Sequence, residues 1–230
     1  MRAIILAAGM GTRLRPLTED RPKGLVKVNG TPMVERQIEY LNEKGIHDIT
    51  LVTGYLHEHY EYMRGKYGVE IVHNDKYDVY NNIYTMYLVR HLLPGAYVVE
   101  SDFYWNNNII DPDPECSTCF CNLREEFTHE WVIKKDENDR ITDFSIEDGH
   151  DDYILSGISY WTEKDGRFIV EKLEEEIKNG NFTDLYWDQM VWRHLGDMYV
   201  KLRRLSSTDT FEIDSVDDLQ KAERKLQLIK

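Results

Sequence analysis

The chain has 230 residues, and 41% of them are hydrophobic, which is enough for the core of one large α/β domain or of two small ones. A net charge of −14 argues against nucleic acid or an anionic membrane as the main partner. No apolar run approaches the ~20 residues of a membrane helix and no secretory signal is visible, so we expect a cytoplasmic protein without a membrane partner.

The first thirty residues combine a buried strand, a loop of small residues and a group of cations. Residues 2–6 are rich in Ile and Leu, which is typical of a strand buried on both faces. Small residues follow it directly: Ala7, Ala8, Gly9 and Gly11. Cations follow the small residues: Arg13, Arg15, Arg21 and Lys23. Because backbone N–H groups in such a loop can approach a phosphate closely, we expect a small polyanion to bind here.

This loop lacks the G-x-G-x-x-G of dinucleotide-binding folds and the G-K-[ST] that closes a P-loop. It reads L-A-A-G-x-G-x-R, followed ten residues later by P-K, and so resembles the sugar-phosphate and choline-phosphate nucleotidyltransferases. A glycine-rich turn beside a solvated basic face is the simpler alternative.

The resemblance implies an enzyme that joins a nucleoside triphosphate to a phosphorylated small molecule and releases pyrophosphate. The nucleotide-binding residues that it implies are Leu6, Ala7, Ala8, Gly9 and Gly11. Arg13 and Lys23 are the implied catalytic cations. Gly24 departs from the family pattern, in which we expect a larger small residue such as alanine after the lysine.

The rest of the first half alternates between strands and helices. Apolar runs predict strands at residues 48–53, 69–73 and 96–100. Helices are predicted from a Thr31 cap and Pro32 up to Gly45, at 56–67 and at 81–93. This order indicates βαβ units and a parallel sheet, whose ligands bind beyond the carboxyl ends of the strands.

From residue 118 onward the pattern changes to mostly antiparallel strands separated by polar turns. Helices are predicted at 163–179, 185–195 and 215–230, and a further strand at 199–205. We therefore predict one α/β domain over residues 1–230, with a Rossmann-like mixed, mostly parallel central sheet flanked by helices and an antiparallel extension. Residues 1–115 are expected mainly to bind the nucleotide, 116–210 mainly the acceptor, and 211–230 to carry a metal motif and the last helix.

Three cysteines lie close together, at Cys116, Cys119 and Cys121. A zinc site would need a fourth ligand, for which His129 is the nearest candidate. An alternating strand explains Cys119 and Cys121 equally well, because it turns both side chains to one face. We expect reduced structural thiols here.

Two aspartates stand at the ends of predicted strands, Asp102 in V-V-E-S-D-F and Asp214 in F-E-I-D-S. Asp102 has the alternative of capping a turn. A capping box of Ser215 and Asp218 explains the start of the last helix but leaves Asp214 without a structural role. The family has metal-binding aspartates at both points, so the resemblance implies one Mg²⁺ shared between them.

A finer resemblance covers essentially the whole chain. T-H-E-W at 128–131, L-S-G-I-S-Y-W at 155–161 and D-L-Y-W-D at 184–188 are similar to the bacterial CTP:phosphocholine cytidylyltransferases. The similarity implies CTP and phosphocholine as substrates and Mg²⁺ as cofactor. Asn81 and Asn82 are the candidates for contacting the base, because their amides both donate and accept hydrogen bonds, with helix capping as the alternative.

Phosphocholine carries a trimethylammonium group, which cannot donate N–H hydrogen bonds and is best bound by aromatic faces and negative charge. The acceptor-binding residues that we expect are Trp131, Tyr160, Tyr186 and Asp188. Tyr160 and Trp161 alternate on a strand, so at most one of the two faces the pocket.

Two other functions stay open. One is transfer to 2-aminoethylphosphonate, a sugar 1-phosphate or another phosphorylated small acceptor. The other is a non-catalytic, nucleotide-binding regulatory domain of the same fold, against which the intact Lys23, Asp102 and Asp214 argue. The sequence also leaves a homo-oligomer open.

Overall fold

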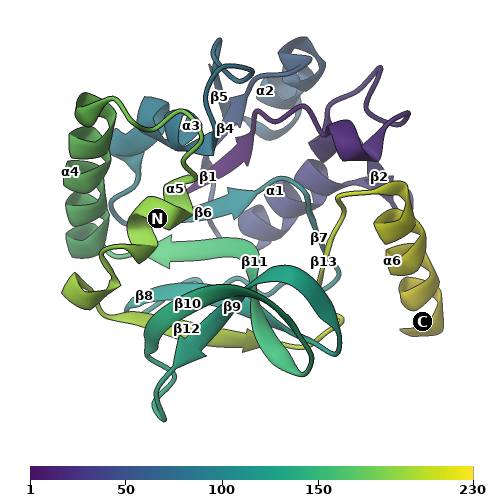
Figure 1. Cartoon of the computed structure of the whole chain (residues 1–230). Coiled ribbons are helices and arrows are strands. Elements are labelled where there is room, and N and C mark those ends of the chain that lie inside the picture. The colour runs from purple at the N-terminus through teal and green to yellow at the C-terminus, as the bar shows by residue number, and fades with distance from the viewer. Residues whose placement is uncertain (230) are drawn as a thin grey trace.

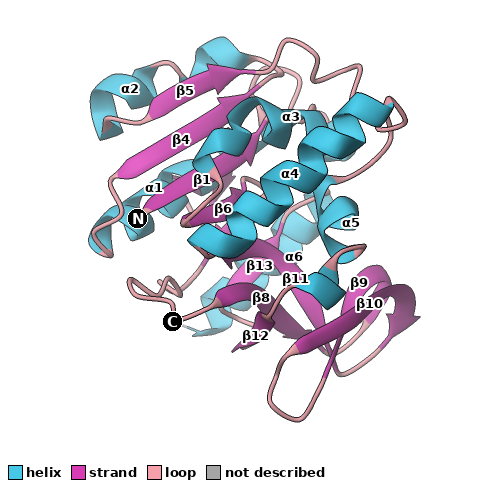
Figure 2. Ribbon diagram, turned by 90° about the vertical axis from the view of Figure 1, so that its left-hand side faces the viewer, coloured by secondary structure: helices cyan, strands magenta, loops and turns pink. Residues whose placement is uncertain are grey.

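The structure is a computed structural model that describes residues 1–229, and its centre is a mixed β-sheet (Figures 1 and 2). Within these residues nine strands form the sheet, in the order β5-β4-β1-β6-β11, after which β8 and β9 both pair with β11. The four strands from β5 to β6 are parallel and β11 runs antiparallel to β6, as the sequence predicted. The strands of this sheet are β1 (Arg2–Ala7), β4 (Asp48–Thr53), β5 (Glu70–His73), β6 (Ala96–Glu100), β8 (Ser117–Arg124), β9 (Phe127–Lys135), β10 (Ile141–Gly149), β11 (Asp152–Trp161) and β12 (Val200–Leu205).

Helices cover both faces of the parallel part of the sheet, so strand β1 is buried on both sides. Ile4 and Leu6 pack on one face, in a core shared with α3 (Asn82–Val89), α4 (Glu163–Asn179) and α5 (Trp187–Trp192). Ala3, Ile5 and Ala7 pack on the other face with α1 (Met33–Glu43) and α2 (Tyr62–Tyr67). Each fully buried large apolar side chain stabilises the fold by about 1.5–3 kcal/mol, which is why this strand is apolar throughout.

Helix α1 begins at Met33, one residue later than predicted. Thr31 and Pro32 form strand β3, which pairs with β2 (Lys27–Val28) across a turn at Asn29 and Gly30. Pro32 keeps an extended backbone, with ψ of 139°, and no side chain caps the first turn. The predicted Thr31 cap is therefore wrong: local pairing with β2 takes these two residues out of the helix.

Three other predicted helices are shorter in the structure, and a tighter 3-10 turn precedes or follows each of them. Residues 56–67 form a 3-10 turn at His57–Tyr60 followed by α2. Helix α3 ends at Val89 and continues as a 3-10 turn at Arg90–Leu92. Helix α5 ends at Trp192, ahead of a turn at Leu195–Asp197. Of the helices within residues 1–229, none is both long enough and apolar enough to cross a membrane.

A second, two-stranded sheet connects the middle of the chain to its end (Figure 1). Strand β7 (Phe103–Trp105) pairs antiparallel with β13 (Thr210–Glu212), and Ile213 N donates to the backbone oxygen of Asp102 at 3.0 Å. Helix α6 (Val216–Ile229) follows. Its predicted capping box is confirmed, since Ser215 N donates to Asp218 at 2.8 Å and Asp218 N to Ser215 Oγ at 3.2 Å. Lys230 lies outside the described residues.

The cysteines follow the predicted alternation of strand β8. Cys119 and Cys121 are buried on one face and Phe120 on the other. All three cysteines are free. Within residues 1–229, no group of three or more His, Cys, Asp or Glu side chains is arranged as a metal site.

Candidate active site

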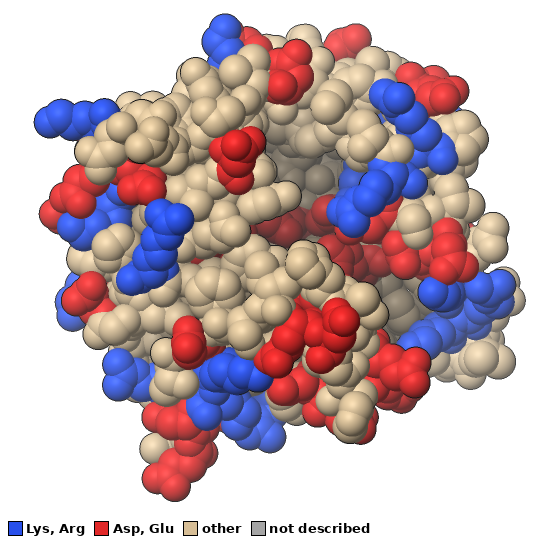
Figure 3. Space-filling view, viewed as in Figure 1, with Lys and Arg blue, Asp and Glu red and all other residues tan. Residues whose placement is uncertain are grey.

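A cleft of about 880 Å³ opens beyond the carboxyl ends of β1 and β6. Figure 3 shows the hollow in the middle of one face, with Asp and Glu side chains inside it and basic side chains at its margin. Its walls come from the glycine loop, the start of α3, the ends of β6 and β13, strands β9 to β11, and α5. Of the site residues that the sequence predicted, all except Tyr160 line this cleft.

The glycine loop forms one end of the cleft. Gly11 has a φ of +60°, and a side-chain carbon there would lie 2.9 Å from Lys23 Cβ, so both backbone shape and space require glycine. At Gly9, by contrast, an added carbon would meet nothing within 4 Å. The backbone at Gly9 therefore faces open space, into which a bound nucleotide can come close. The 3-10 turn Thr12–Leu14, which carries Arg13, follows directly.

Lys23 stands at the start of a 3-10 turn, Lys23–Leu25, beside this loop. The glycine after it, which departed from the family pattern, has a packing reason. A side-chain carbon at Gly24 would lie 2.5 Å from Val34 Cγ2 and 2.8 Å from the hydroxyl of Tyr60, so the neighbouring helix leaves no room for alanine. The other two cations of the stretch, Arg15 and Arg21, do not line the cleft.

Lys23 joins the two aspartates that the sequence singled out. Its Nζ donates to Asp102 Oδ2 at 2.8 Å and also to Asp214 Oδ1. Arg13 Nη2 lies 2.6 Å from the other carboxylate oxygen of Asp214. Burial opposes the charge on Lys23, but the two carboxylates outweigh it and raise the pKa of the lysine above its usual value. The lysine is thus a firmly charged cation between two acids.

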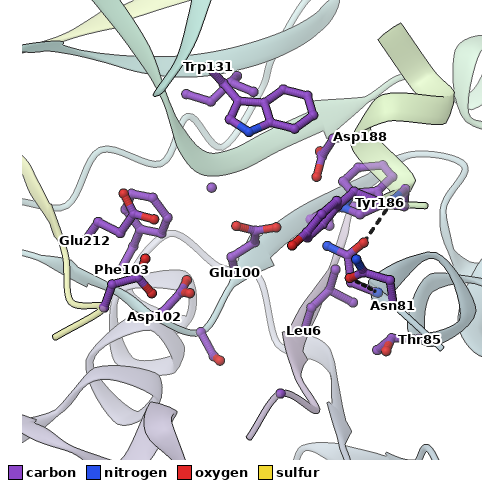
Figure 4. A pocket seen from close by; sticks show the side chains of 18 of the residues that line it. Leu6, Asn81, Thr85, Glu100, Asp102, Phe103, Trp131, Tyr186, Asp188 and Glu212 are labelled. Carbon is purple, nitrogen blue, oxygen red and sulfur yellow. Dashed lines mark hydrogen bonds between the residues drawn. The ribbon is translucent and has the colours of Figure 1, made fainter. Parts of the chain in front are cut away.

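Three further acids face the same cleft, and the sequence analysis had not selected them. Glu100 ends strand β6 and Glu212 ends β13 (Figure 4), and Glu130 lies in β9. Burial, followed by the charge of Asp188, raises the pKa of Glu100 well above its usual value. Burial and then the charge of Asp102 raise the pKa of Glu212 to about 8. The position of Glu100 and Glu212 two residues before the selected aspartates was the only sequence signal for them.

Aromatic side chains and one acid form the far end of the cleft. Figure 4 shows Trp131, Tyr186 and Asp188 on the side away from Asp102, with Glu100 between. The ring of Phe144 stacks on that of Trp131, with 5.1 Å between the ring centroids and 10° between the ring planes. Burial raises the pKa of Asp188 to about 7. This end can surround a small cation with two aromatic faces and negative charge.

Tyr160 does not belong to this group. It lies on the opposite face of β11, where its ring packs 5.2 Å from that of Tyr97. Trp161, the next residue, lines the cleft instead. The expectation that only one of the pair faces the pocket is met, but the acceptor role given to Tyr160 is not supported by its position.

Asn81 and Asn82 line the cleft at the amino end of α3, and both of their side-chain oxygens are already engaged. Asn81 Oδ1 accepts a hydrogen bond from Asn82 N at 2.7 Å. Asn82 Oδ1 accepts one from Trp187 N at 2.9 Å. Asn81 Nδ2 also donates to the backbone oxygen of Asp184 at 3.2 Å, but each amide nitrogen carries two hydrogens, so both residues can still donate to a base.

Comparison with known proteins agrees with this geometry. The nucleotidyl transferase family matches residues 2–76. The choline-phosphate cytidylyltransferase of Streptococcus pneumoniae is 44% identical over 99% of both chains, and a solved structure of that species' CTP:phosphocholine cytidylyltransferase superposes with a TM-score of 0.95 over 98% of both chains.

Two further relatives are more distant. The choline-phosphate cytidylyltransferase of Haemophilus influenzae is 35% identical, over 98% of this chain and 97% of the relative. A 2-aminoethylphosphonate cytidylyltransferase of Lancefieldella rimae is 33% identical, over 94% of this chain and 89% of the relative. Likeness at this level over nearly the full length, together with a shared fold, places the chain in a family. It belongs to the nucleotidyltransferases, in the group of bacterial choline-phosphate cytidylyltransferases.

Proposed function

We propose that this protein transfers CMP from CTP to phosphocholine, giving CDP-choline and pyrophosphate. The observation that carries the proposal is that one cleft joins two different environments. At one end are the glycine loop, Lys23 and the aspartate pair, and at the other are Trp131, Tyr186 and Asp188. A triphosphate suits the first and a quaternary ammonium suits the second.

The chemical step needs little covalent machinery from the protein. A phosphate oxygen of phosphocholine attacks the α-phosphorus of CTP and forms a new P–O bond. The bond from that phosphorus to the oxygen bridging it to the β-phosphate breaks, and its electron pair leaves with pyrophosphate. The attacking phosphate is already an anion near neutral pH, so no general base is required.

The residues of the chain would then align the two phosphates and offset their repulsion. Lys23 is suited to this because it is buried, charged and adjacent to the glycine loop. Arg13 is more exposed, with 75% of its side chain accessible, and can contact the phosphates of the nucleotide as it enters the cleft. Both cations would exchange an aspartate for a phosphate oxygen when the nucleotide binds.

Asp102 and Asp214 fit a Mg²⁺ ion. Mg²⁺ in nucleotide enzymes is commonly held by one or two carboxylates together with substrate phosphates. Asp102 supports this reading, because its buried Oδ1 has no hydrogen-bond partner within residues 1–229. When bound, the ion would neutralise negative charge on the phosphates.

For the base we propose cytosine, contacted by the amide N–H groups of Asn81 and Asn82. Cytosine offers its O2 and N3 atoms as acceptors, whereas uracil carries a hydrogen on N3. CTP should therefore be preferred strongly over purine triphosphates and less strongly over UTP. A cytoplasmic location, where CTP is made, goes with this activity, and a homo-oligomer stays a prediction.

A second acceptor, 2-aminoethylphosphonate, is favoured by one feature of the cleft. Its primary ammonium would profit from carboxylates that accept hydrogen bonds, and Glu100 adds a second acid close to Asp188. The aromatic end of the cleft favours phosphocholine.

The test is a pyrophosphate-release assay with four nucleoside triphosphates against phosphocholine, phosphoethanolamine, 2-aminoethylphosphonate and a sugar 1-phosphate. With CTP, phosphocholine should exceed each of the others by at least ~10-fold in kcat/KM, which corresponds to about 1.4 kcal/mol. A higher kcat/KM with 2-aminoethylphosphonate would show that this compound is the acceptor, and the protein would still be a nucleotidyltransferase. If no pair of substrates releases pyrophosphate, the protein is a non-catalytic domain of this fold.

A further inference from the structure

The amino end of helix α3 is joined by hydrogen bonds to the segment that carries the acceptor residues. Asn81 N donates to the backbone oxygen of Thr183 at 2.9 Å, and Asn81 Nδ2 donates to that of Asp184 at 3.2 Å. Trp187 N donates to Asn82 Oδ1 at 2.9 Å. These contacts connect positions about one hundred residues apart in the sequence, and Figure 4 shows Asn81 and Tyr186 side by side.

The contact at Trp187 matters most, because Trp187 is the first residue of α5. The first four N–H groups of any helix have no partner within the helix. Helix α5 has only six residues and too few internal hydrogen bonds to be stable alone. The oxygen of Asn82, which belongs to a different helix, supplies the acceptor for one of these groups, the N–H of Trp187. Gln189 Oε1 accepts from Tyr186 N at 3.1 Å within the segment, so the bond from Asn82 is the one that ties the start of α5 to another helix.

Tyr186 and Asp188 are the chain neighbours of Trp187. Both line the cleft, Tyr186 with 46% of its surface exposed and Asp188 more deeply placed. Their directions therefore depend on the orientation of the first turn of α5. A ring contact adds to these hydrogen bonds: the rings of Tyr80 and Phe182, whose centroids are 4.9 Å apart, pack between the same two segments.

We propose that Asn82 is a positioning residue for the phosphorylated acceptor: its side-chain oxygen holds the first turn of α5 so that Tyr186 and Asp188 face the cation. The proposal rests on the acceptor end described under the proposed function. It assigns to Asn82 a role toward the acceptor through Trp187, in addition to any hydrogen bond from its amide N–H group to the base.

The experiment compares three variants with the wild type in steady-state assays in which CTP and phosphocholine are varied separately. Asn82→Ala removes the acceptor oxygen, whereas Asn82→Asp keeps an oxygen at the same place. Asn181→Ala is the matched control, since Asn181 is an exposed asparagine in the loop before α5. Thermal unfolding of each protein shows whether the fold has changed.

Asn82→Ala and Asn82→Asp both lose the amide N–H groups that can contact the base, so the KM for CTP should change equally in the two variants. Only Asn82→Ala should raise the KM for phosphocholine at least ~10-fold. Asn82→Asp should bring the KM for phosphocholine back to within about threefold of the wild type, and Asn181→Ala should change neither constant. The proposal is overturned if Asn82→Ala changes the CTP/UTP preference and leaves the acceptor KM alone, because Asn82 then only contacts the base. It is also overturned if both KM values rise together with a lower Tm, or if Asn82→Asp gives no rescue.

The proposed function fails in a different way. If the wild type prefers another acceptor, the same comparison is made with that acceptor, and the difference in acceptor KM between Asn82→Ala and Asn82→Asp still decides the role of Asn82. A wild type without any transfer activity would refute the function itself.

Discussion

Lys23 is the residue at which the charges of the cleft meet, with 13% of its side chain exposed and an aspartate on either side. Its ammonium stands between Asp102 and Asp214, so the carboxylates that would hold a metal are, in this structure, neutralised by a side chain. A bound nucleotide offers the lysine phosphate oxygens as alternative partners. The same side chain can thus balance the charge of the two aspartates before a nucleotide binds and that of the phosphates afterwards.

Lys23→Ala should lower kcat at least ~100-fold, because a positioned charge at a developing negative charge typically contributes about 3 kcal/mol or more to transition-state stabilisation. Pyrophosphate release measures the rate, and circular dichroism should show an unchanged fold. Arg21→Ala is the matched control, since Arg21 lies in the same stretch but pairs with Asp20 at the surface. Near-native turnover of Lys23→Ala would remove the lysine from the mechanism.

Trp131 is the residue that should decide between the two acceptors. Trp131→Ala removes a ring face that binds trimethylammonium without hydrogen bonds, so kcat/KM for phosphocholine should fall at least ~10-fold, while that for 2-aminoethylphosphonate falls less. Acceptor competition in a single reaction measures the preference directly. Tyr160→Phe is the control: Tyr160 packs against Tyr97 on the other face of β11, so the preference should not change. An unchanged preference in Trp131→Ala would reject the aromatic cage.

At the scale of elements, the pairing of β7 with β13 brings Asp102 and Asp214 to the same end of the cleft. Glu212 lies opposite Phe103 in this pair of strands, and the next hydrogen bond runs from Ile213 N to the backbone oxygen of Asp102. Asp102 and Asp214 therefore lie just beyond the ends of two paired strands. Strand pairing fixes the separation of the two backbones, which loops alone would not do.

Asp102→Asn and Asp214→Asn should each lower kcat at least ~10-fold and raise the Mg²⁺ concentration needed for half-maximal rate, because a carboxamide is a weaker ligand for a hard cation than a carboxylate. Rate measured against Mg²⁺ concentration, with Mn²⁺ binding as an independent readout, tests this. Asp217→Asn is the control, since Asp217 is an exposed acid whose partner is Lys221. Full activity of the wild type in excess chelator would exclude the metal.

At the scale of the whole molecule, the net charge of −14 is concentrated in part around the cleft. Burial raises the pKa of Asp188 to about 7, and Glu100 faces it. The unfolded chain would release the proton of Asp188 near pH 4, whereas the folded protein keeps it up to about pH 7. Between these values the folded state binds the extra proton, so this group makes the free energy of unfolding fall as pH rises. The burial of Asp188 therefore destabilises the fold at neutral pH.

Asp188→Asn should accordingly stabilise the unliganded protein, and the gain should be larger at pH 8 than at pH 5. A difference of at least ~1 kcal/mol between the two pH values corresponds to about 2–4 °C in Tm for a chain of this size. Thermal unfolding of the variant and the wild type at both pH values measures it. A gain that is equal at pH 5 and pH 8 would mean that Asp188 is ionised throughout.

Residue order along the chain was enough to predict the glycine loop, the parallel strands and the cations beside them. These features depend on residues that are neighbours in sequence. A buried strand must consist of apolar residues, and a loop that binds phosphate must consist of small ones. For the same reason the capping box at Ser215 and the alternation of Cys119 and Cys121 were predicted from sequence. The Lys23–Asp102–Asp214 group was expected only from the family resemblance.

Contacts between distant segments required the tertiary structure. The face of β11 that Tyr160 occupies depends on the register of that strand, which shifts between Leu155 and Ser159, and a shift of one residue exchanges the two faces. Glu100 and Glu212 became part of the site only when β6 and β13 were brought to one cleft. The contact of Asn82 with α5, about one hundred residues later, could not be read from the sequence, which indicated only a residue for the base. Sequence alone determines which side chains are available, but pairing and packing across the chain decide which of them meet.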